Sequence, residues 1–122
     1  MNKVLIVEDD PALRDVYKEA LLEEGFDCDT AATGSEALSK AQTYAPSVIL
    51  LDIMLPGGMN GFDIAEQLKK NSATFPIPII FLTNLDSEKQ SAMAIGASDY
   101  IVKSNASIPE IIEKINHILA SS

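Results

Sequence analysis

Three carboxylates and one lysine stand at points of this chain where apolar runs end. Asp52 directly follows the run Val48–Leu51, and Glu8 and Asp9 follow the first apolar run of the chain. A carboxylate next to such a run is costly to desolvate unless a cation or another partner neutralises it. Lys103, which follows a weaker apolar run, supplies one positive charge. Side chains of these types can hold a hard divalent cation and accept an anionic group, provided that the fold brings them together.

Five short apolar runs alternate with segments of helical periodicity, which is typical of repeated β–α units. Runs rich in Val, Ile and Leu are typical of parallel strands that are covered by helices on both faces. Right-handed crossovers between such strands build an open, doubly wound sheet. The sequence therefore predicts an α/β fold with one parallel sheet. The expected strands are residues 4–7, 28–32, 48–51, 79–82 and 100–102.

Helix signals lie between the predicted strands. We expect Asp10 to be the N-cap of the first helix, with Pro11 at its first position and Gly25 at its end. The helix before the fourth strand is followed by Phe75, which we expect in the core together with Phe62 and Phe81. The helix that follows the fourth strand has the thinnest apolar stripe. The N-caps expected for the four later helices are Thr33, Asn60, Ser87 and Ser107.

In open α/β sheets, ligands bind beyond the carboxyl ends of the strands. Polar side chains follow four of the five predicted strands there: Glu8 and Asp9, then Asp52, Thr83 and Lys103. For Asp52 alone, a helix cap or a salt bridge to Lys103 would be the simpler interpretation. Three converging carboxylates repel one another, however, and each is harder to ionise without a cation.

Mg²⁺ suits this set, because it binds carboxylate and carbonyl oxygens and keeps water positions open for a phosphate oxygen. Zinc is disfavoured, because no His or Cys lies near these residues in the sequence. The charges of Glu8, Asp9 and Asp52 would be balanced by Mg²⁺ and Lys103. A site neutralised in this way could accept a phosphoryl group on the nucleophilic carboxylate of Asp52.

Composition and charge limit the remaining classes. The chain has 122 residues, a net charge of −9 and 47% hydrophobic residues, which fits one globular domain spanning residues 1–122. The negative charge opposes direct nucleic-acid binding. No apolar run approaches the roughly 20 residues that cross a bilayer, and acidic residues follow the first apolar run before a signal-peptide core could form. We expect a cytoplasmic protein without membrane contact, and with Cys28 as its one cysteine it can form no internal disulfide.

Four segments, in this order and over nearly the whole chain, resemble the receiver domain of two-component response regulators, the CheY-like superfamily. They are VLIVEDD (4–10), ILLDIMLPG (49–57), IFLT (80–83) and GASDYIVK (96–103). The resemblance implies a flavodoxin-like (βα)5 fold with strand order 2-1-3-4-5. It also implies a signalling switch that is not an enzyme acting on other molecules, and whose own chemistry is phosphotransfer and autodephosphorylation.

By position, the resemblance makes Asp52 the phosphoacceptor, which a sensor histidine kinase or a phosphotransfer protein would serve. It assigns Asp9 as a direct ligand of Mg²⁺ and Glu8 as a ligand that acts mainly through water. Met54 would contribute its backbone carbonyl to the same ion. No organic cofactor is implied.

The resemblance makes Thr83 and Lys103 ligands of the phosphoryl oxygens, and Tyr100 the switch aromatic whose rotamer is coupled to inward movement of the threonine. The sequence departs from the family pattern at Ser104 and at Asn84, and in the loop of residues 56–61, which is one residue longer than the common form. Ser104 stands where proline usually follows the lysine, so a trans peptide or a strained loop must place Lys103. Asn84 stands where a small residue is usual, which would narrow access to the phosphoacceptor.

The output would leave through contacts with a downstream protein target, and a homodimer formed on phosphorylation stays open. Met54 and Leu85, which flank the attacking water in relatives, are apolar here, so we expect slow autodephosphorylation. The alternatives are a degenerate receiver that acts by protein contacts alone, and a receiver module of a longer regulator.

Two unrelated classes fit less well. A haloacid-dehalogenase-like phosphatase needs a second aspartate where Met54 stands, together with a cap domain. A flavodoxin-like cofactor binder needs a phosphate-binding loop after the first strand, where Glu8, Asp9 and Asp10 stand instead.

Overall fold

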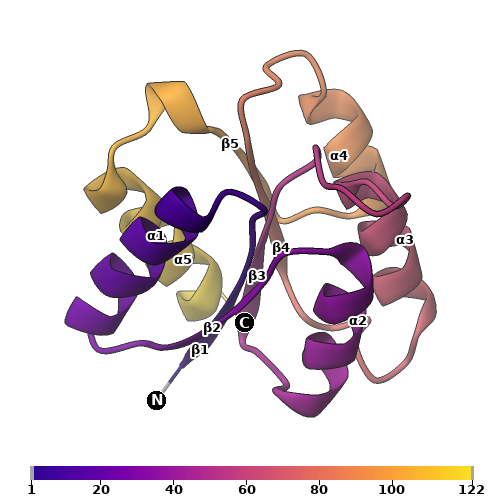
Figure 1. Ribbon diagram of the computed structural model, residues 1–122, viewed down its shortest axis with the longest axis horizontal. Coiled ribbons are helices and arrows are strands. Elements are labelled where there is room, and N and C mark those ends of the chain that lie inside the picture. Colours follow the sequence, from indigo (N-terminus) through magenta and orange to yellow (C-terminus); the bar gives the residue numbers. More distant parts are fainter. Residues whose placement is uncertain (1, 122) are drawn as a thin grey trace.

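A parallel sheet of five strands forms the centre of the computed structural model, which describes residues 2–121 (Figure 1). The strand order is β2-β1-β3-β4-β5, and all four pairings are parallel. Each predicted strand is present, with small shifts at its ends, and the predicted fold class and strand order are confirmed. The strands are β1 (Lys3–Val7), β2 (Asp27–Ala31), β3 (Val48–Leu51), β4 (Ile79–Thr83) and β5 (Asp99–Val102).

Helices cover both faces of the sheet. In Figure 1, α1 and α5 lie on one face and α2, α3 and α4 on the other, which makes the sheet doubly wound. None of the helices formed by residues 2–121 has the length and apolar character needed to cross a bilayer. The helices are α1 (Pro11–Glu23), α2 (Gly34–Thr43), α3 (Gly61–Lys70), α4 (Lys89–Ile95) and α5 (Ile108–Ala120), and a single 3₁₀ turn, η1 (Lys103–Asn105), precedes α5.

Most helix starts follow the predicted capping. Asp10 caps α1 by accepting a hydrogen bond from the backbone N–H of Ala12 at 2.9 Å, and Gly25 follows the helix with φ +90°. Asn60 and Asp63 form a reciprocal capping box at the start of α3. The side chains of Thr33 and Ser107 likewise cap α2 and α5.

The predicted cap of α4 is wrong. The helix begins at Lys89 with Glu88 as its N-cap, and no side chain accepts a hydrogen bond from its first turn. Ser87 stands one position before this N-cap, and its hydroxyl makes no hydrogen bond within residues 2–121. With seven residues, of which Ala92 is the one that is buried, α4 buries fewer of its residues than the other helices do.

Two apolar clusters separated by the sheet form the core. One packs β-strand side chains against α2, α3 and α4, and the other packs them against α1 and α5. Phe81 is fully buried in the first cluster. The expectation that Phe75 lies in the core is wrong, because this residue is 59% exposed in the segment after α3. Its ring centroid lies 5.6 Å from Lys69 Nζ.

Candidate functional site

The predicted carboxylates meet at the carboxyl ends of β1 and β3. Oxygen atoms of Glu8, Asp9 and Asp52 lie within 4.8 Å of one another. Glu8 and Asp52 are buried, whereas Asp9 is exposed. Buried carboxylates require a positive partner, and the spacing of these oxygens could hold a cation.

Lys103 is that partner in the protein itself. Its ammonium lies 2.8 Å from Oδ2 of Asp52 and also donates a hydrogen bond to Oε1 of Glu8. Burial lowers the pKa of Lys103, but the hydrogen bonds to Asp52 and Glu8 outweigh it and raise the pKa above its ordinary value. Burial raises the pKa of Glu8, and the hydrogen bond from Lys103 offsets only part of that rise. The hydrogen bond from Lys103 therefore does not fully compensate for the burial of the Glu8 carboxylate.

Backbone pairing continues past the strands and fixes the two buried carboxylates. The N–H of Glu8 donates to the carbonyl of Ala31 at 2.9 Å, and the N–H of Asp52 donates to the carbonyl of Val7 at 3.1 Å. Arg14 on α1 donates from Nη1 to the carbonyl of Glu8 at 3.1 Å. These hydrogen bonds therefore hold the backbone of Glu8 and Asp52 in place at the ends of β1 and β3.

Gly61 is a positioning residue that the sequence patterns did not single out. A Cβ at this position would collide with the carbonyl oxygen of Asp52, so only glycine lets α3 begin directly against the end of β3. Its N–H donates to the carbonyl of Ile53 at 2.8 Å. A glycine immediately after the predicted cap Asn60 was the available signal.

The carboxylates open into a hollow of about 360 Å³. Met54 lies at its edge, 65% exposed, and its backbone N–H donates to Oδ1 of Asp52 at 3.3 Å. All residues predicted to bind metal or phosphoryl oxygens line this hollow. The lining is completed by Asp10, Leu13 and Asn84, and the predicted set is Glu8, Asp9, Asp52, Met54, Thr83 and Lys103.

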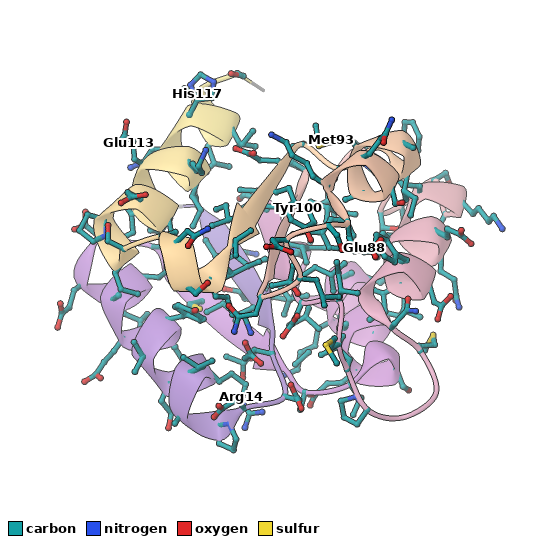
Figure 2. All side chains as sticks on the ribbon, turned by 90° about the horizontal axis from the view of Figure 1, so that it is seen from above. Arg14, Glu88, Met93, Tyr100, Glu113 and His117 are labelled. Atoms are coloured by element: carbon teal, nitrogen blue, oxygen red, sulfur yellow. The ribbon has the colours of Figure 1, made fainter. Side chains whose placement is uncertain are left out.

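Tyr100 does not line the hollow but is connected to it through the backbone. Thr83 is buried, and its Oγ1 accepts a hydrogen bond from the N–H of Leu85 at 3.4 Å. The carbonyl of Leu85 accepts a hydrogen bond from the hydroxyl of Tyr100, whose ring lies between α4 and α5 (Figure 2). The two predicted switch residues are therefore joined through the backbone of Leu85.

The peptide bond between Lys103 and Ser104 is trans, as are all peptide bonds that the structure describes. Of the two expected solutions for placing Lys103, the trans peptide is the one observed.

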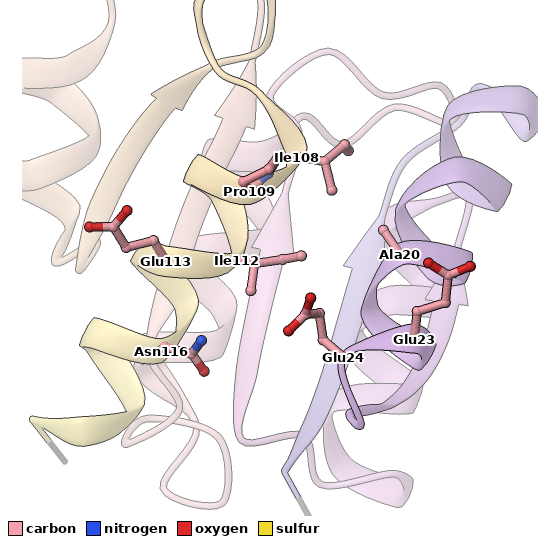
Figure 3. A pocket seen from close by; sticks show the side chains of 8 residues that line it. All are labelled: Ala20, Glu23, Glu24, Ile108, Pro109, Ile112, Glu113 and Asn116. Carbon is pink, nitrogen blue, oxygen red and sulfur yellow. The ribbon is translucent and has the colours of Figure 1, made fainter.

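A second hollow, of about 380 Å³, lies between α1 and α5 (Figure 3). Its floor is formed by Ile108 and Ile112, and the carboxylates of Glu23, Glu24 and Glu113 surround it. It lies apart from Asp52 and Lys103 and shares no lining residue with the acidic hollow.

Known proteins share both the sequence and the fold. Residues 4–116 match the response regulator receiver domain family. The phosphate regulon transcriptional regulatory protein PhoB of Rhizobium meliloti is 37% identical over 121 residues, which are 98% of this chain and 52% of that protein. The chain spans about half the length of the curated relatives it matches.

Solved structures agree with this match. The chemotaxis protein CheY4 of Vibrio cholerae superposes with a TM-score of 0.88 at 33% identity, covering 96% of this chain and 98% of that one. The BeF3-activated N-terminal receiver domain of RstA from Klebsiella pneumoniae superposes with a TM-score of 0.89 at 31% identity, covering 97% and 98%. With its sheet order and its matched residues, the chain belongs to the response regulator receiver domain family.

Proposed function

We propose that this domain is a phosphorylation-dependent switch that accepts a phosphoryl group on Asp52. The observation that carries the proposal is the position of Lys103, whose ammonium contacts Asp52 at 2.8 Å inside a cluster of three carboxylates. A nucleophilic carboxylate, a cation beside it and room for an anion are the parts that phosphoryl transfer needs.

A magnesium ion fits the donor set, which consists of oxygens only. Asp9 and Asp52 would bind it directly, Glu8 mainly through water, and Met54 through its backbone carbonyl. When bound, the ion would neutralise the carboxylates and attract the phosphoryl oxygens. The exposed carboxylate of Asp9 leaves the cluster accessible from solvent.

In the transfer itself, a carboxylate oxygen of Asp52 attacks the phosphorus of a phosphohistidine on a sensor histidine kinase or a phosphotransfer protein. The new O–P bond forms as the P–N bond breaks, and the imidazole leaves with the electron pair. Lys103 and the hydroxyl of Thr83 would hold the phosphoryl oxygens. Water later hydrolyses the acyl phosphate and releases inorganic phosphate, so the domain modifies only its own side chain.

The hydrogen bonds that join Thr83, Leu85 and Tyr100 would carry the change to the surface. When Thr83 moves to contact the phosphoryl group, the N–H and carbonyl of Leu85 and the Tyr100 hydroxyl must rearrange with it. The helix α4, with its one buried residue, lies next to this path. Phosphorylation would thereby favour one of two states that differ little in free energy.

We assign the output to a downstream protein target, and a homodimer on phosphorylation is one form that the active state could take. With a net charge of −9, the domain of residues 1–122 would not bind nucleic acid itself. PhoB of Rhizobium meliloti is a transcriptional regulatory protein of about twice this length, so this chain would serve a similar output as one module of a longer regulator. A cytoplasmic location fits a phosphohistidine donor.

Incubation with acetyl phosphate and Mg²⁺, followed by intact-mass measurement, tests the proposal. We expect one added phosphoryl group in the wild type and none in Asp52→Asn. Beryllofluoride, with which the RstA receiver domain was activated, should shift the amide signals of Thr83, Tyr100 and the last helix. A wild type that is neither modified nor responsive to Mg²⁺ would contradict the proposal and favour a degenerate receiver.

A further inference from the structure

The side chain of Asn84 bridges two loops at the edge of the acidic hollow. Its Oδ1 accepts a hydrogen bond from the backbone N–H of Ser104 at 3.0 Å. Asn84 directly follows β4 and Thr83, whereas Ser104 directly follows Lys103 in the 3₁₀ turn η1. One hydrogen bond thus ties the loop of the predicted phosphoryl-binding threonine to the turn that carries the lysine.

This bond fixes the peptide plane on the carboxyl side of Lys103. The N–H of Ser104 belongs to the first turn of η1, where backbone donors have no partner within the turn. Asn84 supplies the missing acceptor from another strand, as a capping side chain does for a helix. Between Val102 at the end of β5 and this bonded N–H, the backbone of Lys103 is held on both sides.

Two of the positions where the sequence departs from its family, 84 and 104, are therefore partners. A proline after Lys103 has no N–H, and an alanine or glycine after Thr83 has no side-chain acceptor, so in those cases neither departure alone could form this bond. Serine at 104 provides the donor, and asparagine at 84 provides the acceptor.

We propose that Asn84 is a positioning residue, which acts through the Ser104 N–H to hold Lys103 against Asp52 and the incoming phosphoryl group. The inference rests on the proposed function for the role of Lys103, and it adds a residue and a contact that place this lysine without proline. Asn84 itself touches neither metal nor phosphoryl group in this account.

The test separates placement of the lysine from binding of the metal. We would compare the wild type with Asn84→Leu, which keeps the size of the side chain but has no acceptor, and with Asn84→Asp, which keeps the acceptor. Asn105→Ala is the matched control, because Asn105 is an exposed asparagine of the same turn whose side chain makes no hydrogen bond within residues 2–121. The measurements are the dissociation constants of Mg²⁺ and of beryllofluoride, the ¹⁵N signal of the Lys103 ammonium, and hydrogen exchange of the Ser104 amide.

For Asn84→Leu we expect beryllofluoride binding to weaken by about two- to tenfold, the range that one net hydrogen bond supplies, without weaker Mg²⁺ binding. The Ser104 amide should exchange faster, and the Lys103 ammonium signal should broaden. Asn84→Asp should restore the exchange protection and the lysine signal, and Asn105→Ala should behave as the wild type. An unchanged lysine signal in Asn84→Leu, or equal loss of Mg²⁺ and beryllofluoride binding, would overturn the inference.

Ser104→Pro removes the donor and leaves the Asn84 side chain intact. This variant therefore separates loss of the hydrogen bond from an effect of the side-chain size at position 84 on the hollow. In that background, Asn84→Leu should have no further effect, because the partner is already gone. Additive losses would show that Asn84 acts by another route. The Lys103 ammonium signal and the exchange of the Ser104 amide can both be measured without phosphorylation. If the wild type failed to bind beryllofluoride, the proposed function would be contradicted. The two measurements would still show whether Asn84 positions Lys103.

Discussion

The hydroxyl of Tyr100 donates a hydrogen bond to the carbonyl oxygen of Leu85, whose own N–H donates to Thr83 Oγ1. Replacing the tyrosine by phenylalanine keeps the ring, whose centroid lies 6.3 Å from that of Phe81, and removes this bond.

For Tyr100→Phe we expect a loss of about 1 kcal/mol in the free energy of unfolding, as for one hydrogen bond, measured by urea titration. Beryllofluoride should still bind, but the amide shifts that it causes should no longer reach α4. Tyr17→Phe is the control, because Tyr17 is buried in the other core and its hydroxyl makes no hydrogen bond within residues 2–121. Shifts that still spread through α4 in Tyr100→Phe would contradict this role.

Lys103 neutralises two buried carboxylates, so Lys103→Met should leave both without a positively charged partner. Without Mg²⁺ we expect a loss of about 3 kcal/mol in the free energy of unfolding. The exposed pair of Lys114 and Asp99, 3.4 Å apart, offers the comparison: Lys114→Met should cost no more than about 0.5 kcal/mol. Equal losses in the two variants would show that burial does not govern the pair. Added Mg²⁺ should restore part of the stability of Lys103→Met.

Glu8 should destabilise the metal-free fold at neutral pH. Burial raises its pKa, so the folded state binds the proton more tightly than the unfolded chain does. Its contribution to stability is therefore present below the ordinary carboxyl pKa and is lost as the pH rises through the folded pKa. We expect Glu8→Gln to raise the melting temperature at pH 7 in the presence of a chelator, with a difference that shrinks toward pH 4. The exposed control Glu23→Gln should show no such trend, and a less stable Glu8→Gln at pH 7 would refute the expectation.

Cys28 should be inert in the folded protein. It is 8% exposed on β2, and burial raises the pKa of its thiol to about 12. Since the thiolate is the reactive form, a chromogenic disulfide reagent at pH 8 should modify it only after unfolding in urea. Rapid modification of the native protein would mean that the edge of the sheet opens readily.

The Met54 side chain itself has no polar group that could orient a water near Asp52, so the acyl phosphate should be long-lived. The Met54 side chain is 65% exposed, and a polar replacement should therefore fold normally. We expect Met54→Asn to shorten the lifetime of the phosphoryl group by about tenfold, well within what a positioned proton-handling group contributes. Loss of label is followed by intact mass after removal of acetyl phosphate. A wild-type half-life of seconds at neutral pH would contradict slow autodephosphorylation.

The sequence patterns predicted the features that depend on residues close together in the chain. The apolar run before Asp52 was sufficient to predict β3, and the order of strands and helices brought the acidic residues to one edge. The start of α4 was mispredicted, because Ser87 looks like a cap in sequence while the preceding loop sets where the first turn begins. Phe75 shows the same limit, since residue type does not reveal that a loop leaves a ring exposed.

Contacts between distant residues lay outside the reach of the patterns. The bond between Tyr100 and Leu85 and the bond between Asn84 and Ser104 join loops that are separated in the chain. Asn84 and Ser104 could each be seen as unusual, but their pairing depends on how two loops meet in space. The clash that excludes a side chain at Gly61 depends on how closely α3 approaches β3.

The single buried residue of α4 has an energetic consequence. A helix that loses little on displacement can exchange between two positions separated by a small free-energy gap. A ligand that prefers one position by a hundredfold moves that equilibrium by about 2.8 kcal/mol, since each factor of ten is worth about 1.4 kcal/mol. For a helix that is anchored by the buried Ala92 and the partly buried Ile95, with no capping side chain at its start, a preference of that size should suffice to invert the two populations. Additional buried side chains on α4 would increase the free-energy difference that phosphorylation has to overcome to move the helix.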